Sequence, residues 1–362
     1  MQRSSLAPTR RYEPVLDGLR AVSILFVVIR HLEITTLISA NLGVTVFFFI
    51  SGFIITRLML VEAAAAGGID MLRFWGRRFA RLIPALYLMI GVVVALALTL
   101  QLAIDWGQVL AGLLYVMNYY TISLRDAGLQ YTLPINPLWS LAVEEHYYVI
   151  YPFLFAAFFR QTRRFMLVLG GVIVASLIWR IVNITALDFT PQYNYFASES
   201  RIDTILFGCL LALVAAEAAR GDGGMRRVIA LCSSPWVVAL ATVLLFASLF
   251  GPGEVFRHAL RYTLQSVLLF VIVAGILFGE RLGGLRHLLS LAPMVLIGRI
   301  SYSLYLWHLP MAFFLERMMP ATGPVYGWLT LLLSCAVAAA SYFWFERPVI
   351  RHFAPRLRAA GG

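Results

Sequence analysis

Lysine is absent from this 362-residue chain, and all 29 basic residues are arginine. This absence excludes a lysine nucleophile or a lysine Schiff base. Cysteine is scarce: Cys209, Cys232 and Cys335 each lie in or beside an apolar run, so we expect structural thiols and no disulfide framework. The sequence contains no metal-ligand cluster, phosphate-binding glycine pattern or Gly-x-Ser-x-Gly elbow, and so does not support a metallohydrolase, a nucleoside triphosphatase or an ordinary serine hydrolase.

Charged residues are also scarce. They make up 13% of the chain, whereas 61% is hydrophobic, which excludes a single water-facing globule. In hydrocarbon every backbone polar group must be satisfied internally, so long apolar runs predict spanning helices of about 20 residues each. The net charge of +11 could suggest a nucleic-acid partner, but the arginines lie in short loops between apolar runs, so we expect none.

The apolar runs predict an all-α polytopic membrane protein with about ten transmembrane helices. The predicted spans are 17–36, 43–61, 82–101, 138–159, 166–186, 202–219, 235–250, 262–279, 292–315 and 324–345. A further apolar segment, 107–120, is too short to cross alone, and we expect it to be interfacial or re-entrant. The predicted organisation is a tail (1–14), a transmembrane domain (15–346) and a second tail (347–362).

The arginines of the loops predict the orientation. With the N-terminus inside, twenty arginines fall in interior loops or tails and five in exterior loops, which favours cytoplasmic termini at both ends. No short apolar segment with a small-residue cleavage site opens the chain, and the first apolar run carries Arg20 and His31. We therefore expect a retained first helix.

Arg20 and His31 are the first candidate site residues. They lie eleven residues apart, almost three helical turns, so both fall on one face of the first span, about 16 Å apart along its axis. Ionisable groups at membrane depth normally face the bundle interior or a water-filled path. The structural alternatives are an arginine that extends to the inner surface and a hydrogen-bonded histidine. In the functional interpretation, His31 acts as a base or an acyl carrier.

The interior loop before the third span concentrates arginines and aromatic residues. Arg73, Arg77, Arg78 and Arg81 lie within nine residues, with Arg78 and Arg81 on one helical face. The loop can be an ordinary positive-inside signal. Guanidinium groups at a membrane surface also suit the phosphates of a lipid or of coenzyme A.

The segment 137–148, PLWSLAVEEHYY, opens the fourth predicted span. Glu144 and Glu145 can reflect the usual preference for acidic residues at helix starts. Alternatively, one of these carboxylates orients a histidine or accepts its proton, as in acyl transfer to a hydroxyl. Weaker signals, each more often structural than functional, come from Asn118, Glu346, Ser301 and two pairs of residues. In one pair, Arg201 and Asp203 could form an ion pair at a helix entrance; in the other, Tyr305 and His308 share a helical face with Ser301.

Together these stretches resemble the membrane-bound acyltransferase family 3, the enzymes that acetylate O-antigen and exopolysaccharides. The resemblance covers residues 12 to 353. It rests on LDGLRA (16–21), Arg20 followed by ten residues and His31, GVTVFFFISGFIITRL (43–58), FWGRRFARLIP (74–84), PLWSLAVEEHYY (137–148) and ISYSLYLWH (300–308).

The resemblance implies ten helices in a bacterial inner membrane and essential roles for Arg20, His31, Arg78 and Arg81. His146 departs from the glutamine usual in the family, and Arg30 replaces an apolar neighbour of His31. Many relatives also carry a C-terminal periplasmic hydrolase-like domain. This sequence ends at Gly362 without one, so we expect it to act alone or with a separate periplasmic partner.

The resulting hypothesis is transfer of an acyl group, expected to be acetyl, from cytoplasmic acyl-CoA to a hydroxyl of a glycan or lipid-linked sugar. The catalytic candidates are His31, Glu144 and Glu145. The coenzyme A candidates are Arg20, Arg77, Arg78 and Arg81, no metal is expected, and the acceptor candidates are Trp139, Ser140, His146, Arg201, Asp203, Tyr305 and His308. The alternatives are a transporter or flippase without acyl chemistry and a lipid-binding scaffold whose arginines hold headgroups.

Overall fold

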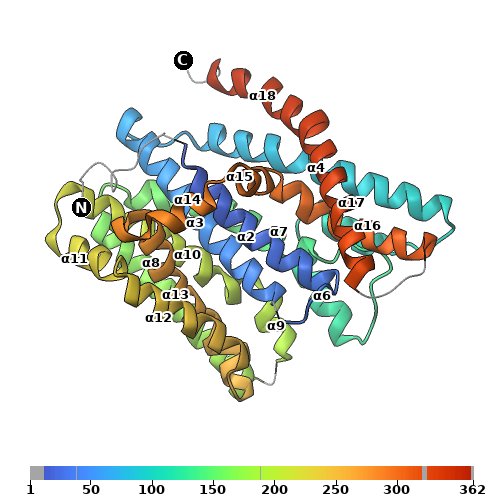
Figure 1. The fold of residues 1–362 in the computed structure, drawn as a ribbon, viewed down its shortest axis with the longest axis horizontal. Coiled ribbons are helices and arrows are strands. Elements are labelled where there is room, and N and C mark those ends of the chain that lie inside the picture. The colour runs from blue at the N-terminus through green and yellow to red at the C-terminus, as the bar shows by residue number, and fades with distance from the viewer. Residues whose placement is uncertain (1–11, 38, 188, 320–323, 360–362) are drawn as a thin grey trace. The chain divides into compact units, whose positions relative to one another are not determined.

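The computed structural model describes residues 12–37, 39–187, 189–319 and 324–359. Every regular element within these residues is a helix, as Figure 1 shows. The predicted all-α fold class is therefore confirmed for the described part of the chain.

Six helical segments of the described residues are long and apolar enough to cross a membrane. They are α3 (Ala40–Ala66), α4 (Met71–Thr99), α8 (Thr162–Thr185), α9 with α10 (Pro191–Phe196 and Ser198–Arg220), η2 with α13 (Phe256–Leu260 and Arg261–Phe278), and Val325–Phe353, which runs through α17 (Pro324–Ala340), η4 (Ser341–Glu346) and α18 (Arg347–Ala359). A seventh candidate is bent by 64° between α11 (Gly223–Cys232) and α12 (Pro235–Ala247), the latter continued by η1 (Ser248–Phe250). The chain is thus a polytopic membrane protein with six or seven candidate spans.

Three further helices are as long as a span but more polar. They are α2 (Pro14–His31, 18 residues), α7 (Leu138–Phe158, 21 residues) and α16 (Ser301–Met318, 18 residues). These helices carry Arg20 and His31, the Glu144–Glu145 pair, and Tyr305 with His308. The helices that fall outside the set of apolar spans are therefore those that bear most of the predicted site.

Two predicted segments are divided differently in the structure. The segment 107–120 lies in two short helices, α5 (Trp106–Leu113) and α6 (Met117–Asp126), of 8 and 10 residues, and neither is long enough to span hydrocarbon. The predicted span 292–315 is not one helix, because α15 (Ala292–Arg299) ends before Ile300, whose ψ of 4° leaves the helical region. Two short elements, η3 (Glu280–Leu282) and α14 (Gly283–Leu289), precede α15.

The chain forms two compact units. The first comprises Met1–Ser23, Val44–Ile69 and Tyr151–Gly298, and the second comprises Ile24–Gly43, Asp70–Ile150 and Arg299–Gly362. In the first unit, α10 is buried along most of its length and packs against α8, α11 and α13. A methyl group at Gly52 of α3 would lie 1.9 Å from the carbonyl oxygen of Ile205, and one at Gly208 of α10 would lie 1.9 Å from that of Phe49. The close contact between α3 and α10 therefore depends on these two glycines.

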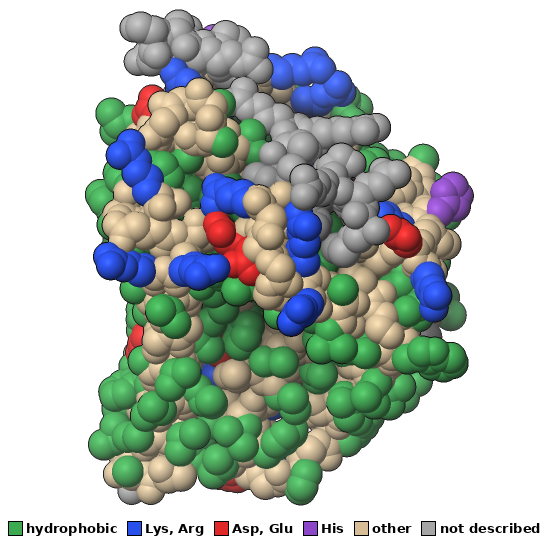
Figure 2. Space-filling model, turned by 90° about the vertical axis from the view of Figure 1, so that its left-hand side faces the viewer, with side chains coloured by type: hydrophobic (Ala, Val, Ile, Leu, Met, Phe, Trp, Pro, Cys, Tyr) green, Lys and Arg blue, Asp and Glu red, His purple; other side chains and the backbone are tan. Residues whose placement is uncertain are grey.

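The second unit contains α4 to α6, the first part of α7, and α16 to α18. Within it α16 packs against α17 and α4, and α18 packs against α4; α16 and α17 lie side by side in Figure 1. Large apolar side chains remain on the outside of both units, among them Leu98 on α4 and Trp236 on α12. On the face shown in Figure 2, hydrophobic side chains cover a broad area with few charged groups. Such a surface is suited to a hydrocarbon environment.

Candidate active site

His31 is the last residue of α2, because the chain turns out of the helix directly after it. The backbone of Glu33 is left-handed, with φ of 54°. Its N–H donates to the carbonyl of Arg30 at 3.3 Å, and the N–H of Ile34 donates to that of Ile29 at 3.1 Å. These two bonds form a Schellman motif, which commonly ends helices. His31 therefore lies at a helix end, where its side chain is exposed, and not inside a span that continues to residue 36.

His31 pairs with a second histidine that lies 277 residues away in the sequence. Nδ1 of His31 lies 2.9 Å from Nε2 of His308, and the two rings are nearly parallel, with an interplanar angle of 5°. His308 is fully buried, and its Nδ1 lies 2.8 Å from the carbonyl oxygen of Tyr305 and 3.2 Å from that of Leu304. An exposed histidine is thus held by a buried one.

Tyr305 connects α16 to the start of α7. Its hydroxyl lies 2.6 Å from Oγ of Ser140 and donates to the carbonyl of Pro137 at 2.8 Å. Its ring also contacts His308, with centroids 5.7 Å apart. The structure therefore brings together three residues that the sequence assigned to acceptor binding: Ser140, Tyr305 and His308.

The two adjacent glutamates of α7 have different surroundings, although both are buried. Glu144 accepts a hydrogen bond from the hydroxyl of Tyr148 at 3.1 Å. In contrast, Oε1 of Glu145 is buried without a hydrogen-bond partner. The guanidinium of Arg78 lies 5.3 Å from the centroid of the Tyr148 ring and is attracted by both carboxylates. Arg78 and the glutamate pair therefore belong to one cluster.

The arginines of α4 present different faces. Arg77 is exposed, whereas Arg78 and Arg81 are half-buried. Arg81 is attracted by the buried carboxylate of Glu346, which accepts hydrogen bonds from Ser303 at 2.6 Å and from Ser341 at 2.9 Å. Glu346 was predicted only as a weaker signal, although an acidic residue inside an apolar helix was visible in the sequence.

The remaining candidates in the second unit lie on α7. The ring of His146 packs against that of Tyr119 on α6, with centroids 6.1 Å apart and an interplanar angle of 27°. Trp139 is buried one residue before Ser140. His146 is therefore directed to α6, and the histidine that pairs with His31 is His308.

Arg20 belongs to the first unit, although it shares α2 with His31. It forms an ion pair with Asp17 at 3.7 Å and lies 5.7 Å from the centroid of the Phe47 ring. The helix supports the predicted common face of Arg20 and His31, and it adds Asp17 as a neighbour that the sequence analysis did not consider.

The possible ion pair between Arg201 and Asp203 does not form, because each residue has another partner. Asp203 pairs with Arg180 of α8 at 2.7 Å, and Thr263 donates to the same carboxylate at 2.8 Å. Arg201 instead donates to Oγ1 of Thr45 at 3.2 Å and lies 4.0 Å from the centroid of the Tyr262 ring. Both arginines are fully buried. Arg180 was not among the predicted residues, although an arginine inside a predicted span was a visible signal.

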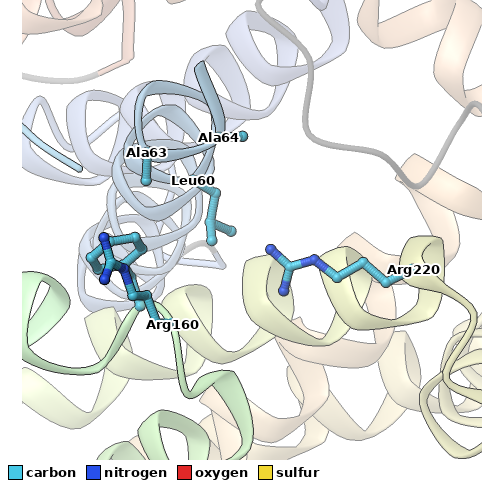
Figure 3. A pocket seen from close by; sticks show the side chains of 6 residues that line it. Leu60, Ala63, Ala64, Arg160 and Arg220 are labelled. Carbon is cyan, nitrogen blue, oxygen red and sulfur yellow. The ribbon is translucent and has the colours of Figure 1, made fainter. Parts of the chain in front are cut away.

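The first unit also contains a pocket of about 260 Å³ between the ends of α3, α7 and α10, drawn in Figure 3. Its lining comprises Leu60, Ala63, Ala64, Phe159, Arg160 and Arg220. Arg220 is paired with Glu217 at 2.5 Å, and Arg160 donates to the carbonyl of Gly67 at 3.4 Å. None of the predicted site residues lines this pocket.

Comparison with known proteins identifies related chains. A family model described as an acyltransferase domain matches residues 13–344. The O-acetyltransferase OatA of Staphylococcus aureus (strain NCTC 8325 / PS 47) is 31% identical over 348 residues, which cover 94% of this chain and 57% of that protein. The peptidoglycan O-acetyltransferase OatA of Listeria monocytogenes serovar 1/2a is 29% identical over 360 residues, covering 94% and 56%.

The chain thus spans little more than half the length of these curated relatives. No solved structure gives a significant match.

Proposed function

Because the chain belongs to the acyltransferase 3 family, we propose that it is a membrane O-acyltransferase that moves an acetyl group from acetyl-CoA to a hydroxyl. One observation carries this proposal. The exposed imidazole of His31, held by buried His308, lies in the same compact unit as Arg78, Arg81 and the Glu144–Glu145 pair. Acyl transfer from coenzyme A uses a base, carboxylates, and cationic groups that bind the phosphates.

The proposed topology has ten spans and cytoplasmic termini. Ten spans result if the six apolar spans are joined by the bent pair of α11 and α12, counted as one, and by the polar helices α2, α7 and α16. Polar helices can cross because ionisable groups such as Glu144, Glu145 and His308 are buried within the protein and are not presented to lipid. The excess of arginine in alternate loops then places α4 and its arginines at the cytoplasmic surface, where coenzyme A is available.

In this proposal the arginines bind the donor. Arg77, Arg78 and Arg81 hold the phosphates of coenzyme A, since guanidinium groups bind phosphate oxygens through paired hydrogen bonds. Arg20, almost three turns before His31 on α2, guides the pantetheine arm. The thioester then reaches His31.

The transfer needs an unprotonated nitrogen of His31. In direct transfer this nitrogen takes the proton of the acceptor hydroxyl while the oxygen attacks the thioester carbon. The carbon–sulfur bond then breaks, and the coenzyme A thiolate takes the same proton. In a two-step route the nitrogen itself attacks the thioester carbon, the carbon–sulfur bond breaks and the coenzyme A thiolate leaves. The hydroxyl oxygen then attacks the acyl-imidazole, the carbon–nitrogen bond breaks, and the hydroxyl proton passes to the thiolate.

The proposed acceptor is a hydroxyl of a cell-envelope glycan or lipid-linked sugar. The Listeria relative carries peptidoglycan in its name, and this is the support for a cell-wall glycan. In the second unit the predicted acceptor residues are Trp139, Ser140, His146 and Tyr305 on α7 and α16. Arg201 and Asp203, predicted for the same role, lie in the first unit, where both are fully buried.

The test uses purified protein in lipid nanodiscs with labelled acetyl-CoA and a pool of cell-envelope glycans. Free coenzyme A and labelled glycan are measured for wild type, for His31→Ala and for His352→Ala, a control at an exposed histidine of α18. We expect His31→Ala to lower release of coenzyme A by about 10² to 10⁴-fold and the control to match wild type. Equal release from folded His31→Ala contradicts the proposal. Accumulation of an unmodified glycan in sealed vesicles without coenzyme A release would indicate a transporter.

A further inference from the structure

We propose that His308 is a positioning residue that fixes the tautomer of His31, with the proton on Nδ1 and with Nε2 as the reactive nitrogen. The catalytic consequence rests on the proposed acyl transfer, whereas the tautomer itself follows from the hydrogen bonds around the two rings. His308 was predicted to bind the acceptor; its contact with His31 gives it a second role.

The proton of the buried His308 ring is assigned by its backbone partners. Nδ1 of His308 faces two carbonyl oxygens, those of Tyr305 at 2.8 Å and Leu304 at 3.2 Å. Carbonyl oxygens only accept hydrogen bonds, so Nδ1 of His308 must carry a proton. In a neutral imidazole the other nitrogen then has a lone pair. Nε2 of His308 is therefore an acceptor.

The proton of His31 follows from this assignment. Nδ1 of His31 lies 2.9 Å from Nε2 of His308, a normal hydrogen-bond distance. Because Nε2 of His308 accepts, Nδ1 of His31 must donate, and it carries the proton. Nε2 of His31 therefore keeps its lone pair. Either route of acyl transfer needs such an unprotonated nitrogen.

The geometry of the rings agrees with a hydrogen bond in the ring plane. The planes differ by 5°, and the centroids are 5.2 Å apart. The distance between the centroids is larger than the distance of 2.9 Å between the two nitrogens by about one ring diameter, as it is when both nitrogens lie between the two centroids. The imidazoles therefore meet edge to edge and not face to face. The lone pair of an imidazole nitrogen lies in the ring plane, where it can accept the proton of His31.

The arrangement is held from the buried side. His308 has no exposed surface, and both of its backbone acceptors belong to the preceding turn of α16. That turn is fixed to α7 through the hydroxyl of Tyr305, which bonds to Ser140 and to Pro137. His31 is exposed, so its reactive nitrogen is not enclosed by the contact that orients it.

The hydrogen bond also contributes during the reaction. When Nε2 of His31 takes the hydroxyl proton, the imidazole becomes a cation, and its Nδ1–H bond to His308 becomes charge-assisted and stronger. The proton then passes from Nε2 to the departing thiolate, and the Nδ1 proton does not move. A carboxylate serves the corresponding purpose in the serine-protease triad, and its replacement by an amide lowers turnover by about 10⁴-fold.

Two substitutions separate the role toward His31 from a structural role. In His308→Asn the short amide retains the contact with the α16 carbonyls but cannot reach His31. In His308→Gln the longer amide can place an oxygen near the position of Nε2 and accept from His31. We expect His308→Asn to lower kcat for coenzyme A release by about 10²-fold or more with little change in KM for acetyl-CoA, and His308→Gln to restore most of kcat. His352→Gln is the control, at an exposed histidine.

The tautomer is measured directly by nitrogen-15 NMR of histidine-labelled protein in nanodiscs, with the His31 signals identified by their loss in His31→Ala. We expect a protonated Nδ1 and an unprotonated Nε2 for His31 in wild type and in His308→Gln, and a changed pattern in His308→Asn. A proton on Nε2 of His31 in wild type overturns the inference, as does a folded His308→Asn with wild-type kcat. The spectrum can be recorded whether or not the protein is active. An inactive wild type would therefore contradict the proposed function, while the spectrum would still test the tautomer.

Discussion

The carboxylate of Asp203 on α10 lies 2.7 Å from the guanidinium of Arg180 on α8, and neither side chain has any exposed surface. Arg180 also donates hydrogen bonds to four other groups, and together with Asp203 they supply an acceptor for each of its N–H bonds. These groups are Oγ of Ser176, the carbonyls of Ser200 and Ala259, and Oγ1 of Thr263. The pair is therefore a fully bonded buried charge pair.

Removal of one charge from this pair should destabilise the first unit. We expect Asp203→Asn to reduce stability by about 3 to 5 kcal/mol, because Arg180 is left as an uncompensated buried charge. The measurement is thermal unfolding of detergent-solubilised protein. The control is Asp222→Asn, since Asp222 pairs with an arginine whose side chain is 78% exposed, and there we expect little change. Equal losses of stability in the two variants would show that the buried pair contributes no more to stability than the exposed pair.

Arg78 should act through the phosphates of the donor. We expect Arg78→Gln to raise KM for acetyl-CoA by about 10-fold to 100-fold, the range for loss of one charge-assisted hydrogen bond. The same change should leave KM for S-acetyl-pantetheine, which lacks the nucleotide phosphates, nearly unchanged. Arg351→Gln, at an exposed arginine of α18, serves as the control. An equal effect on both donors would place Arg78 outside the phosphate site.

The two glutamates of α7 should differ in their effect on turnover. The carboxylate of Glu144 is occupied by the hydroxyl of Tyr148, whereas Oε1 of Glu145 is buried without a partner. A buried polar atom without a partner is costly and is often explained by a functional role. We expect Glu145→Gln to lower kcat by about 10²-fold, and Glu144→Gln to lower it less. Measured kcat values in the opposite order would contradict this assignment.

The contact between α3 and α10 should not tolerate a side chain at Gly208. An added methyl group would lie 1.9 Å from the carbonyl oxygen of Phe49, so the two helices must separate. We expect Gly208→Ala to cost about 1 to 3 kcal/mol, seen as a lower melting temperature. The matched control is Gly170→Ala on α8, where an added methyl group meets nothing within 4 Å and alanine favours the helix. A Gly208→Ala variant as stable as this control would refute the close contact.

The class of the protein and many of its candidate site residues follow from patterns along the chain. Apolar runs longer than a span predict helices in lipid, because the backbone has no other partner there, and the described residues confirm a helical, polytopic protein. Spacing along one helix also placed Arg78 and Arg81 on a common face. The adjacent Glu144 and Glu145 needed no fold to be recognised. The motifs likewise identified the family, which the comparisons confirm.

Which of these residues are in contact depends on the tertiary structure. Periodicity describes neighbours along one helix, whereas contacts between helices depend on how side chains of different helices pack. His31 and His308 are 277 residues apart, and no local pattern relates them. For the same reason Asp203 pairs with Arg180 of another helix and not with Arg201, two positions away on its own helix, because residues at that spacing do not face each other.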